Sequence, residues 1–217
     1  MLKKPNLNRS KLRIQDAQTV LYQEAGALKI LAETLENDAK FSKNFIKALH
    51  LIEASQKKGK LIVTGVGKSG HIAHKLAATF ASMGTPAFFI HPAEASHGDL
   101  GMITKQDTVL AMSKSGETKE MFDLLAYCNK YKVPVIGMCM KADSMLAKKS
   151  DVPLIMPDLP EACPLGKAPT VSTTMTLALG DALSVVTAQR CGLDKDAFLK
   201  WHPGGKLGAT LAQEKKK

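Results

Sequence analysis

The sequence predicts an α/β fold in three layers, built on a parallel sheet of five strands. Five short apolar runs follow residue 59, and segments with helical spacing separate most of them. Strands that alternate with helices form right-handed crossover units, which leave the strands parallel. The apolar runs are continuous rather than alternating, which is typical of strands covered by helices on both faces. A chain of 217 residues with 45% hydrophobic residues is long enough to bury such a core.

The segment before the first strand is helical in pattern. Apolar residues recur at spacings of three and four from about residue 12 to residue 57, with an interruption at Asn37 and Asp38. Two helices with no strand between them predict an N-terminal helical hairpin, which would cover the sheet or form an interface.

The remaining elements are expected in order along the core. Strands are predicted at 60–64, 87–91, 108–112, 134–140 and 152–156, and helices at 69–83, 117–131, 144–149 and 172–191. The chain is therefore expected to be one domain over 1–217. It would have a helical extension (1–57), a parallel α/β core (58–191) and a C-terminal helical segment with a basic tail (192–217).

Charge and cysteine content restrict the class of protein. The net charge is +10, but residues 1–15 carry five basic and no acidic residues, and the tail 214–217 adds two more positive charges. The body is only about +3, which favours an anionic substrate over nucleic acid or a membrane. No signal peptide or membrane span is evident, and the four cysteines form no CxxC pair. We expect a cytoplasmic protein with reduced thiols.

The stretch 108–120, TVLAMSKSGETKE, is the strongest functional signal. An apolar strand leads into a turn that contains Ser113, Ser115, Gly116 and Thr118, and a helical pattern follows. Hydroxyl groups and the unpaired N–H groups of a first helical turn are donors suited to a phosphate. The alternative is an ordinary capped helix, in which Ser115 and Thr118 serve the cap.

A glycine-rich turn follows the first strand, at 65–71. It matches G-x-G-x-x-G, but the acidic residue that would hold a ribose at the end of the second strand is missing, so a dinucleotide site is weakly supported. A Walker A motif would need a glycine at Ile62. What remains is Lys68 and Ser69 at a helix start, where Lys68 would contact a phosphate or sugar oxygen, or else simply be solvated.

Three further segments bring polar side chains to strand ends or turns. His91 and His97 lie beyond the second strand, and polar contacts to a substrate suit them better than a metal, for which no third ligand is identified. Glu161 follows the fifth strand, and His202 stands in a His-Pro-Gly-Gly turn after the last long helix. Carboxylates and histidines beside an anion site suit proton transfer on a phosphorylated small molecule.

Together these motifs resemble the sugar isomerase (SIS) domain family, and within it the arabinose-phosphate isomerases. The resemblance rests on the segments 65–103, 113–120 (SKSGETKE), 161–183 (EACPLGKAPTVSTTMTLALGDAL) and 202–208 (HPGGKLG). It implies a flavodoxin-like five-stranded sheet, a homotetramer, and interconversion of D-arabinose 5-phosphate and D-ribulose 5-phosphate for lipopolysaccharide. Members commonly continue into a pair of CBS domains, whereas this sequence stops before them, either as a natural short form or as part of a longer protein. Short forms can serve capsule or other surface sugars, so the pathway stays open.

The resemblance also implies roles for individual residues. Glu161 is the first candidate for the base that moves a proton between C1 and C2, in a pocket that would raise its pKa, and Glu120 is the second. His202 would move protons on oxygen or open a ring, and its position suggests that it reaches a neighbouring subunit's site. Lys68 would face the sugar oxygens or the phosphate. The residues expected to bind substrate are Ser69, Ser113, Ser115 and Thr118 at the phosphate, and Gly84, Thr85, His91 and His97 along the sugar.

No cofactor and no metal is expected to be required, although a metal contacting His91 would be inhibitory. Two alternatives stay open. One is a SIS isomerase of a hexose or heptose phosphate, and the other is a non-catalytic regulator that binds a sugar phosphate. A nucleotide-dependent oxidoreductase is a weaker third.

Overall fold

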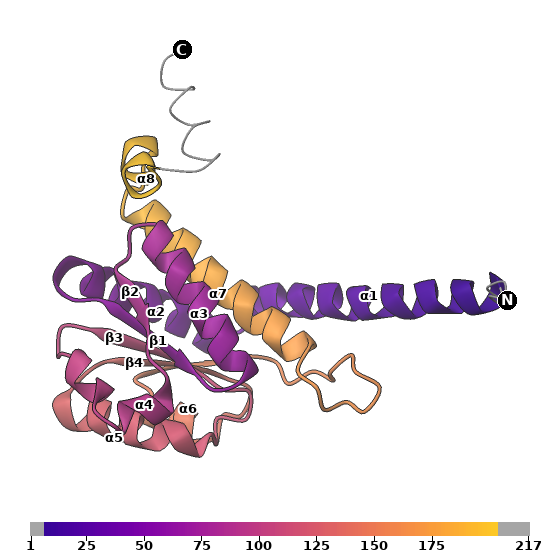
Figure 1. Cartoon of the computed structure of the whole chain (residues 1–217), viewed down its shortest axis with the longest axis horizontal. Helices are drawn as coiled ribbons and strands as arrows, with labels where there is room; N and C mark the ends of the chain where they lie inside the picture. Colours follow the sequence, from indigo (N-terminus) through magenta and orange to yellow (C-terminus); the bar gives the residue numbers. More distant parts are fainter. Residues whose placement is uncertain (1–6, 204–217) are drawn as a thin grey trace, which may run out of the picture.

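A five-stranded parallel sheet forms the centre of the molecule in the computed structural model, which describes residues 7–203 (Figure 1). The strand order is β2-β1-β3-β4-β5, and every neighbouring pair is parallel. The strands are β1 (Leu61–Gly65), β2 (Ala87–Phe89), β3 (Thr108–Met112), β4 (Val135–Cys139) and β5 (Val152–Ile155). This is the flavodoxin-like order, in which the chain reverses direction across the sheet between β1 and β3.

Helices cover both faces of this sheet, so the predicted three layers are confirmed. One face is covered by α2 (Ala39–Lys58), α3 (Lys68–Ser82) and α7 (Val171–Arg190), with α1 (Leu7–Asn37) packed on α7. The other face carries α5 (Phe122–Tyr131) and α6 (Met145–Lys149), with the short α4 (Pro92–Ala95) beside α5.

The two faces have separate cores, as the two-residue period of a strand requires. Leu61 and Val63 of β1 join the core under α2, α3 and α7, whereas Ile62 between them joins the core under α5 and α6. All five residues of β1, β3 and β4 are buried. The continuous apolar runs in the sequence are therefore strands with both faces covered.

The N-terminal hairpin is present, and its break falls at a single residue. Asp38 ends α1 and caps α2, with its carboxylate accepting from the N–H groups of Lys40 and Phe41. Ala27 and Leu31 of α1 are buried against the body. The earlier part of α1 extends away from the body in Figure 1 and exposes Leu21 and Tyr22.

Helix α7 is the one described helix long and apolar enough to meet the length and composition of a membrane span. Half of that window is buried inside the molecule, and α7 packs against α1, α2 and α3. These contacts are those of a core helix.

Several short helices were not predicted. The loop after β2 contains α4 and a 3₁₀ helix, η1 (Asp99–Met102). The described part of the expected C-terminal helical segment forms one short helix, α8 (Lys195–Trp201), which follows α7. The helix predicted at 117–131 begins only at Phe122, after a second 3₁₀ helix, η2 (Lys119–Met121).

Candidate active site

A polar pocket opens at the carboxyl ends of β1 and β3, where the strand order reverses. It has a volume of about 450 Å³ and is lined by Ser69, Ser113, Lys114, Ser115, Thr118, Lys141 and Asp158. We call it the switch-point pocket. Parallel α/β sheets hold their ligands at this position because the loops diverge there and leave a crevice. Four residues predicted to hold a phosphate therefore meet at one cavity.

Hydrogen bonds within the turn after β3 fix its hydroxyl groups. Ser113 Oγ accepts from the Gly116 N–H at 3.0 Å and lies 2.8 Å from Thr118 Oγ1. Gly116 has φ of +70°, and a Cβ there would lie 2.1 Å from Ser144 Oγ, so glycine is required. The turn is closed before any helix begins.

This geometry corrects one expectation about the phosphate site. The first helical turn of α5 was expected to supply N–H donors, but α5 begins at Phe122, well beyond the turn. Thr118 precedes η2, yet its hydroxyl bonds Ser113 instead of capping the helix. The turn therefore offers an anion its own hydroxyls, in place of the N–H groups of the first turn of α5.

The glycines of the G-x-G-x-x-G segment have packing roles. A Cβ on Gly65 would lie 2.9 Å from the backbone of Ser69, and one on Gly70 would lie 2.8 Å from the carbonyl oxygen of Gly65. These glycines let α3 start close against β1. Lys68 is exposed as the first residue of α3, and Ser69 reaches the switch-point pocket.

Glu161 lies beside this pocket, and its carboxylate is saturated with donors. Oε1 accepts from Lys114 Nζ and from Ser172 Oγ, each at 2.5 Å. Oε2 accepts from the Thr170 N–H at 2.8 Å, and from Thr170 Oγ1 and the Ser172 N–H at 3.2 Å. The Glu161 side chain is 0% exposed.

The expectation that this pocket raises the pKa of Glu161 is wrong. Burial by itself would raise the pKa, but hydrogen bonds from Lys114, Ser172 and Thr170 outweigh it and lower the pKa from 4.5 to about 2. A carboxylate with this pKa holds no proton near neutrality and accepts one poorly. In this arrangement Glu161 anchors Lys114 and the start of α7.

A second ion pair lines the outer part of the pocket. Lys141 Nζ donates to the carboxylate of Asp158, and this hydrogen bond raises the pKa of Lys141. Both side chains are more exposed than the Lys114–Glu161 pair. The pocket therefore presents two lysines, each with a carboxylate partner.

The loop after β2 that carries His91 and His97, residues 91–101, is here called the histidine loop, and it lies next to the turn on the α5 side of the sheet. Its short helix α4 contacts η2, which carries the exposed Glu120. His91 caps α4, with its Nδ1 accepting from the Ala93 N–H at 3.2 Å, and His97 is exposed. The described residues offer the Glu120 carboxylate no hydrogen bond, and they contain no group of three or more His, Cys, Asp or Glu side chains that could hold a metal.

The opposite end of the sheet, where the strands begin, holds three other predicted residues: Gly84, Thr85 and His202. The fifteen residues of α3 carry the chain about 22 Å from Lys68 at one edge to Gly84 and Thr85 at the other. Gly84 packs so closely on Trp201 that a Cβ would lie 2.2 Å from its ring, and His202 follows Trp201 directly. These three predicted residues therefore cannot join the switch-point pocket of their own chain.

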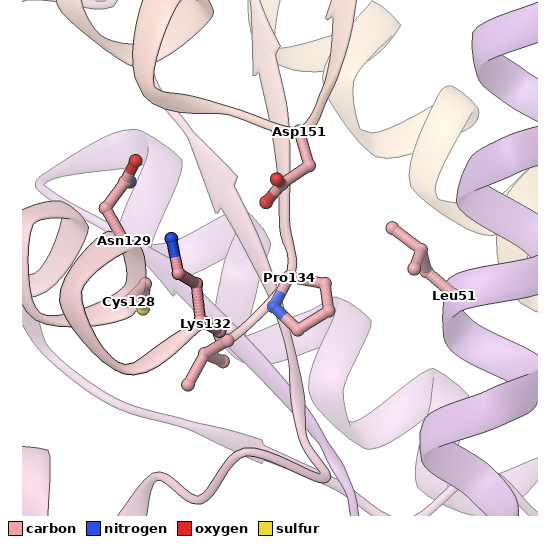
Figure 2. A pocket seen from close by; sticks show the side chains of 7 residues that line it. Leu51, Cys128, Asn129, Lys132, Pro134 and Asp151 are labelled. Atoms are coloured by element: carbon pink, nitrogen blue, oxygen red, sulfur yellow. The ribbon is translucent and has the colours of Figure 1, made fainter.

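A different cavity, of about 260 Å³, lies at the amino-terminal ends of the strands, near the start of β4 (Figure 2). Its lining includes Cys128, whose thiol has its pKa raised by burial to about 12. Asp151, also in the lining, accepts from the Val135 N–H at 2.8 Å. None of the predicted site residues lines this cavity, and its buried thiol is unsuited to act as a nucleophile.

Sequence reasoning missed three residues of the switch-point pocket: Lys114, Lys141 and Asp158. Lys114 stands between two predicted phosphate-binding serines, so its place in the turn was a usable signal. Its pairing with Glu161 joins residues 47 positions apart and could not be read from either motif alone.

Comparison with known proteins identifies the same family that the sequence motifs resemble. The SIS domain model matches residues 55–186, which is more than half of the chain. Arabinose 5-phosphate isomerase KdsD of Yersinia pestis is 48% identical over 88% of this chain and 58% of its own length, and KdsD of Pseudomonas aeruginosa is 46% identical over 91% and 58%. This chain thus spans about three fifths of these curated relatives.

A solved structure agrees in fold and covers a protein of similar length. Escherichia coli CFT073 c3406 in complex with A5P has a TM-score of 0.80 and is 36% identical, with 92% of this chain and 100% of that one covered. The family match, the identity to the curated relatives and the shared fold agree. This chain belongs to the SIS domain family.

Proposed function

We propose that this protein is an aldose–ketose isomerase that interconverts D-arabinose 5-phosphate and D-ribulose 5-phosphate. The observation that carries the proposal is the hydroxyl-lined pocket at the point where the strand order reverses, since a phosphate needs such donors. The relatives named arabinose 5-phosphate isomerase, and the related structure in complex with A5P, support the choice of sugar. The product would feed lipopolysaccharide or capsule sugar synthesis.

In this proposal the phosphate sits against Ser69, Ser113, Ser115 and Thr118. Ser113 and Thr118 are already oriented by their mutual hydrogen bond, which lowers the cost of ordering them around a ligand. With the phosphate held there, the sugar would extend toward His91 and His97 on the neighbouring loop, and Lys68 at the start of α3 would meet a sugar or phosphate oxygen.

Isomerisation needs a base that removes the proton from C2 of the aldose and returns one to C1. We rank Glu120 ahead of Glu161 for this role. The Glu161 carboxylate accepts from Lys114, Thr170 and Ser172 and has a pKa of about 2, which makes it a weak base. Glu120 is exposed on η2, beside the histidine loop, with a carboxylate that can approach a bound sugar. Glu161 would act instead as a positioning residue.

His202, Gly84 and Thr85 enter this proposal through a neighbouring copy of the chain. They lie at the amino-terminal ends of the strands, away from the switch-point pocket, so a site that uses them must be shared between subunits of a homo-oligomer. We propose that this oligomer is a tetramer. His202 would then move protons between the enediol oxygens of its neighbour's substrate. We propose that the reaction takes place in the cytoplasm and needs neither a cofactor nor a metal.

A colorimetric ketose assay on a panel of C5, C6 and C7 aldose phosphates tests the proposal. We expect ketose to form fastest from D-arabinose 5-phosphate. Faster turnover of a hexose or heptose phosphate would reassign the substrate within the same reaction class. Saturable protection of the protein in thermal melts, with no ketose from any sugar, would indicate a binding regulator and would overturn the proposal.

A further inference from the structure

Lys114 connects two parts of the switch-point pocket. Its backbone belongs to the turn that carries the phosphate-binding hydroxyls, with its carbonyl oxygen accepting from the Met140 N–H at 3.1 Å. Its side chain lines the cavity and is 37% exposed, while its ammonium reaches the fully buried carboxylate of Glu161 at 2.5 Å. A single residue therefore touches both the proposed phosphate site and the buried acid.

The Glu161 carboxylate does not depend on Lys114 for its hydrogen bonds. Four other contacts, two from Thr170 and two from Ser172, satisfy both of its oxygens. Lys114 adds the one charged partner that Glu161 has among the described residues. The lysine can therefore leave without stranding a buried polar atom, which is the condition for an exchange of partners. The hydrogen bonds from Ser172 and Thr170 still lower the pKa of Glu161 after Lys114 has left.

A phosphate entering the pocket competes with Glu161 for this ammonium. The phosphate dianion carries more charge than the carboxylate and accepts through three oxygens, and hydrogen bonds between ionised groups are the strong ones. The four hydroxyl residues of the pocket are neutral donors, so without a lysine the dianion would have no compensating charge on the turn.

We propose that Lys114 is a phosphate ligand that Glu161 holds in place while the pocket is empty and gives up when the sugar phosphate binds. The proposal rests on the proposed function for the identity of the ligand, but phosphate binding itself can be measured without turnover. Glu161 would therefore keep a cation beside the pocket while it is empty and compete with the ligand for it.

The test measures the affinity of inorganic phosphate by isothermal titration calorimetry in the full chain. Lys114→Gln should weaken binding by about 10- to 100-fold, the range for one hydrogen bond between charged groups. The affinity of Lys114→Arg for phosphate should stay within about threefold of that of the parent protein, because arginine keeps the charge. Lys149→Gln removes an equal charge from an exposed position at the end of α6, and should leave the affinity unchanged.

The variant Glu161→Gln tests whether Lys114 binds phosphate or has only a structural role. It removes the competing carboxylate, so phosphate should bind several-fold tighter than in the parent protein. Loss of a negative charge near the pocket would have a similar effect without any role for Lys114, and the double variant Lys114→Gln/Glu161→Gln resolves this. The gain should disappear in the double variant, because the lysine that produces it is gone.

Three results would overturn the proposal: unchanged affinity in Lys114→Gln, an equal gain from Glu161→Gln with and without Lys114, or no phosphate binding in the parent protein. If Lys114→Gln folds poorly, Lys114→Met takes its place in the single and the double variant, because it keeps a long aliphatic side chain and removes the charge. Phosphate binding with the expected pattern but no ketose formation would leave this inference standing and remove the proposed function instead.

Discussion

The buried carboxylate of Glu161 should make the stability of this protein depend on pH in a defined window. Its pKa is about 2 in the folded protein against 4.5 for the free group. A depressed carboxyl pKa gives stability that is fully present above pH 4.5 and is lost as the pH falls toward 2. At about 1.4 kcal/mol for each tenfold change in proton affinity, the contribution at neutral pH is on the order of 3 kcal/mol, of which about 2 kcal/mol is lost by pH 3.

Glu161→Gln removes the titrating group and keeps the shape of the side chain. Urea unfolding followed by circular dichroism gives the free energy of unfolding for both proteins at pH 7 and pH 3. We expect the difference between them to shrink by about 2 kcal/mol from pH 7 to pH 3. Glu36→Gln, on an exposed part of α1, controls for the loss of one carboxylate. A difference that stays constant between the two pH values would refute the reasoning about Glu161.

Three other predictions follow from the placement of residues. Glu120→Gln should lower kcat by about 10²- to 10⁴-fold with little change in KM. The control Glu117→Gln changes a side chain that accepts from the Met145 N–H, and it should keep the parent kcat. Equal kcat values for Glu120→Gln and the parent protein would rule out Glu120 as the base. Mixed oligomers of Glu120→Gln and His202→Asn should be more active than either variant alone if subunits share sites, and exchange of subunits without any gain would argue against sharing. Gly180→Ala should cost about 1–3 kcal/mol in urea unfolding, because a Cβ there would lie 2.3 Å from Leu76, while Gly26→Ala, which meets nothing, should stabilise α1 by up to about 1 kcal/mol.

The strands were predictable because each is a short apolar run bounded by turn residues. The strand at 108–112 was predicted at its observed bounds, and β1, β4 and β5 differ by one residue at one or both ends. The start of α5 was misplaced because Ser113 and Gly116 close a turn of their own, and η2 follows before the helix. Local hydrogen bonds of this kind do not alter the spacing of hydrophobic residues, from which the helix start was predicted.

The candidate site was predictable where it depends on topology alone. Ser69 and Ser113 follow β1 and β3, and parallel strands bring those loops together at one edge. The environment of Glu161 depends instead on Lys114, Thr170 and Ser172, which close around it only in the folded chain, and the expected direction of its pKa was therefore wrong. His202 lies at the amino-terminal ends of the strands because Trp201 of α8 packs against Gly84, just after the end of α3, a contact that no local pattern encodes.

Isomerisation in heavy water, followed by NMR, tests the proposed reaction itself. The protein is incubated with D-arabinose 5-phosphate in D₂O, without added metal or cofactor. We predict that D-ribulose 5-phosphate forms and that solvent deuterium appears at the carbon that receives the proton, as an enediol intermediate requires. A protein that binds the sugar phosphate but yields neither ketose nor deuterium exchange would contradict the assignment and leave this fold with a binding function only.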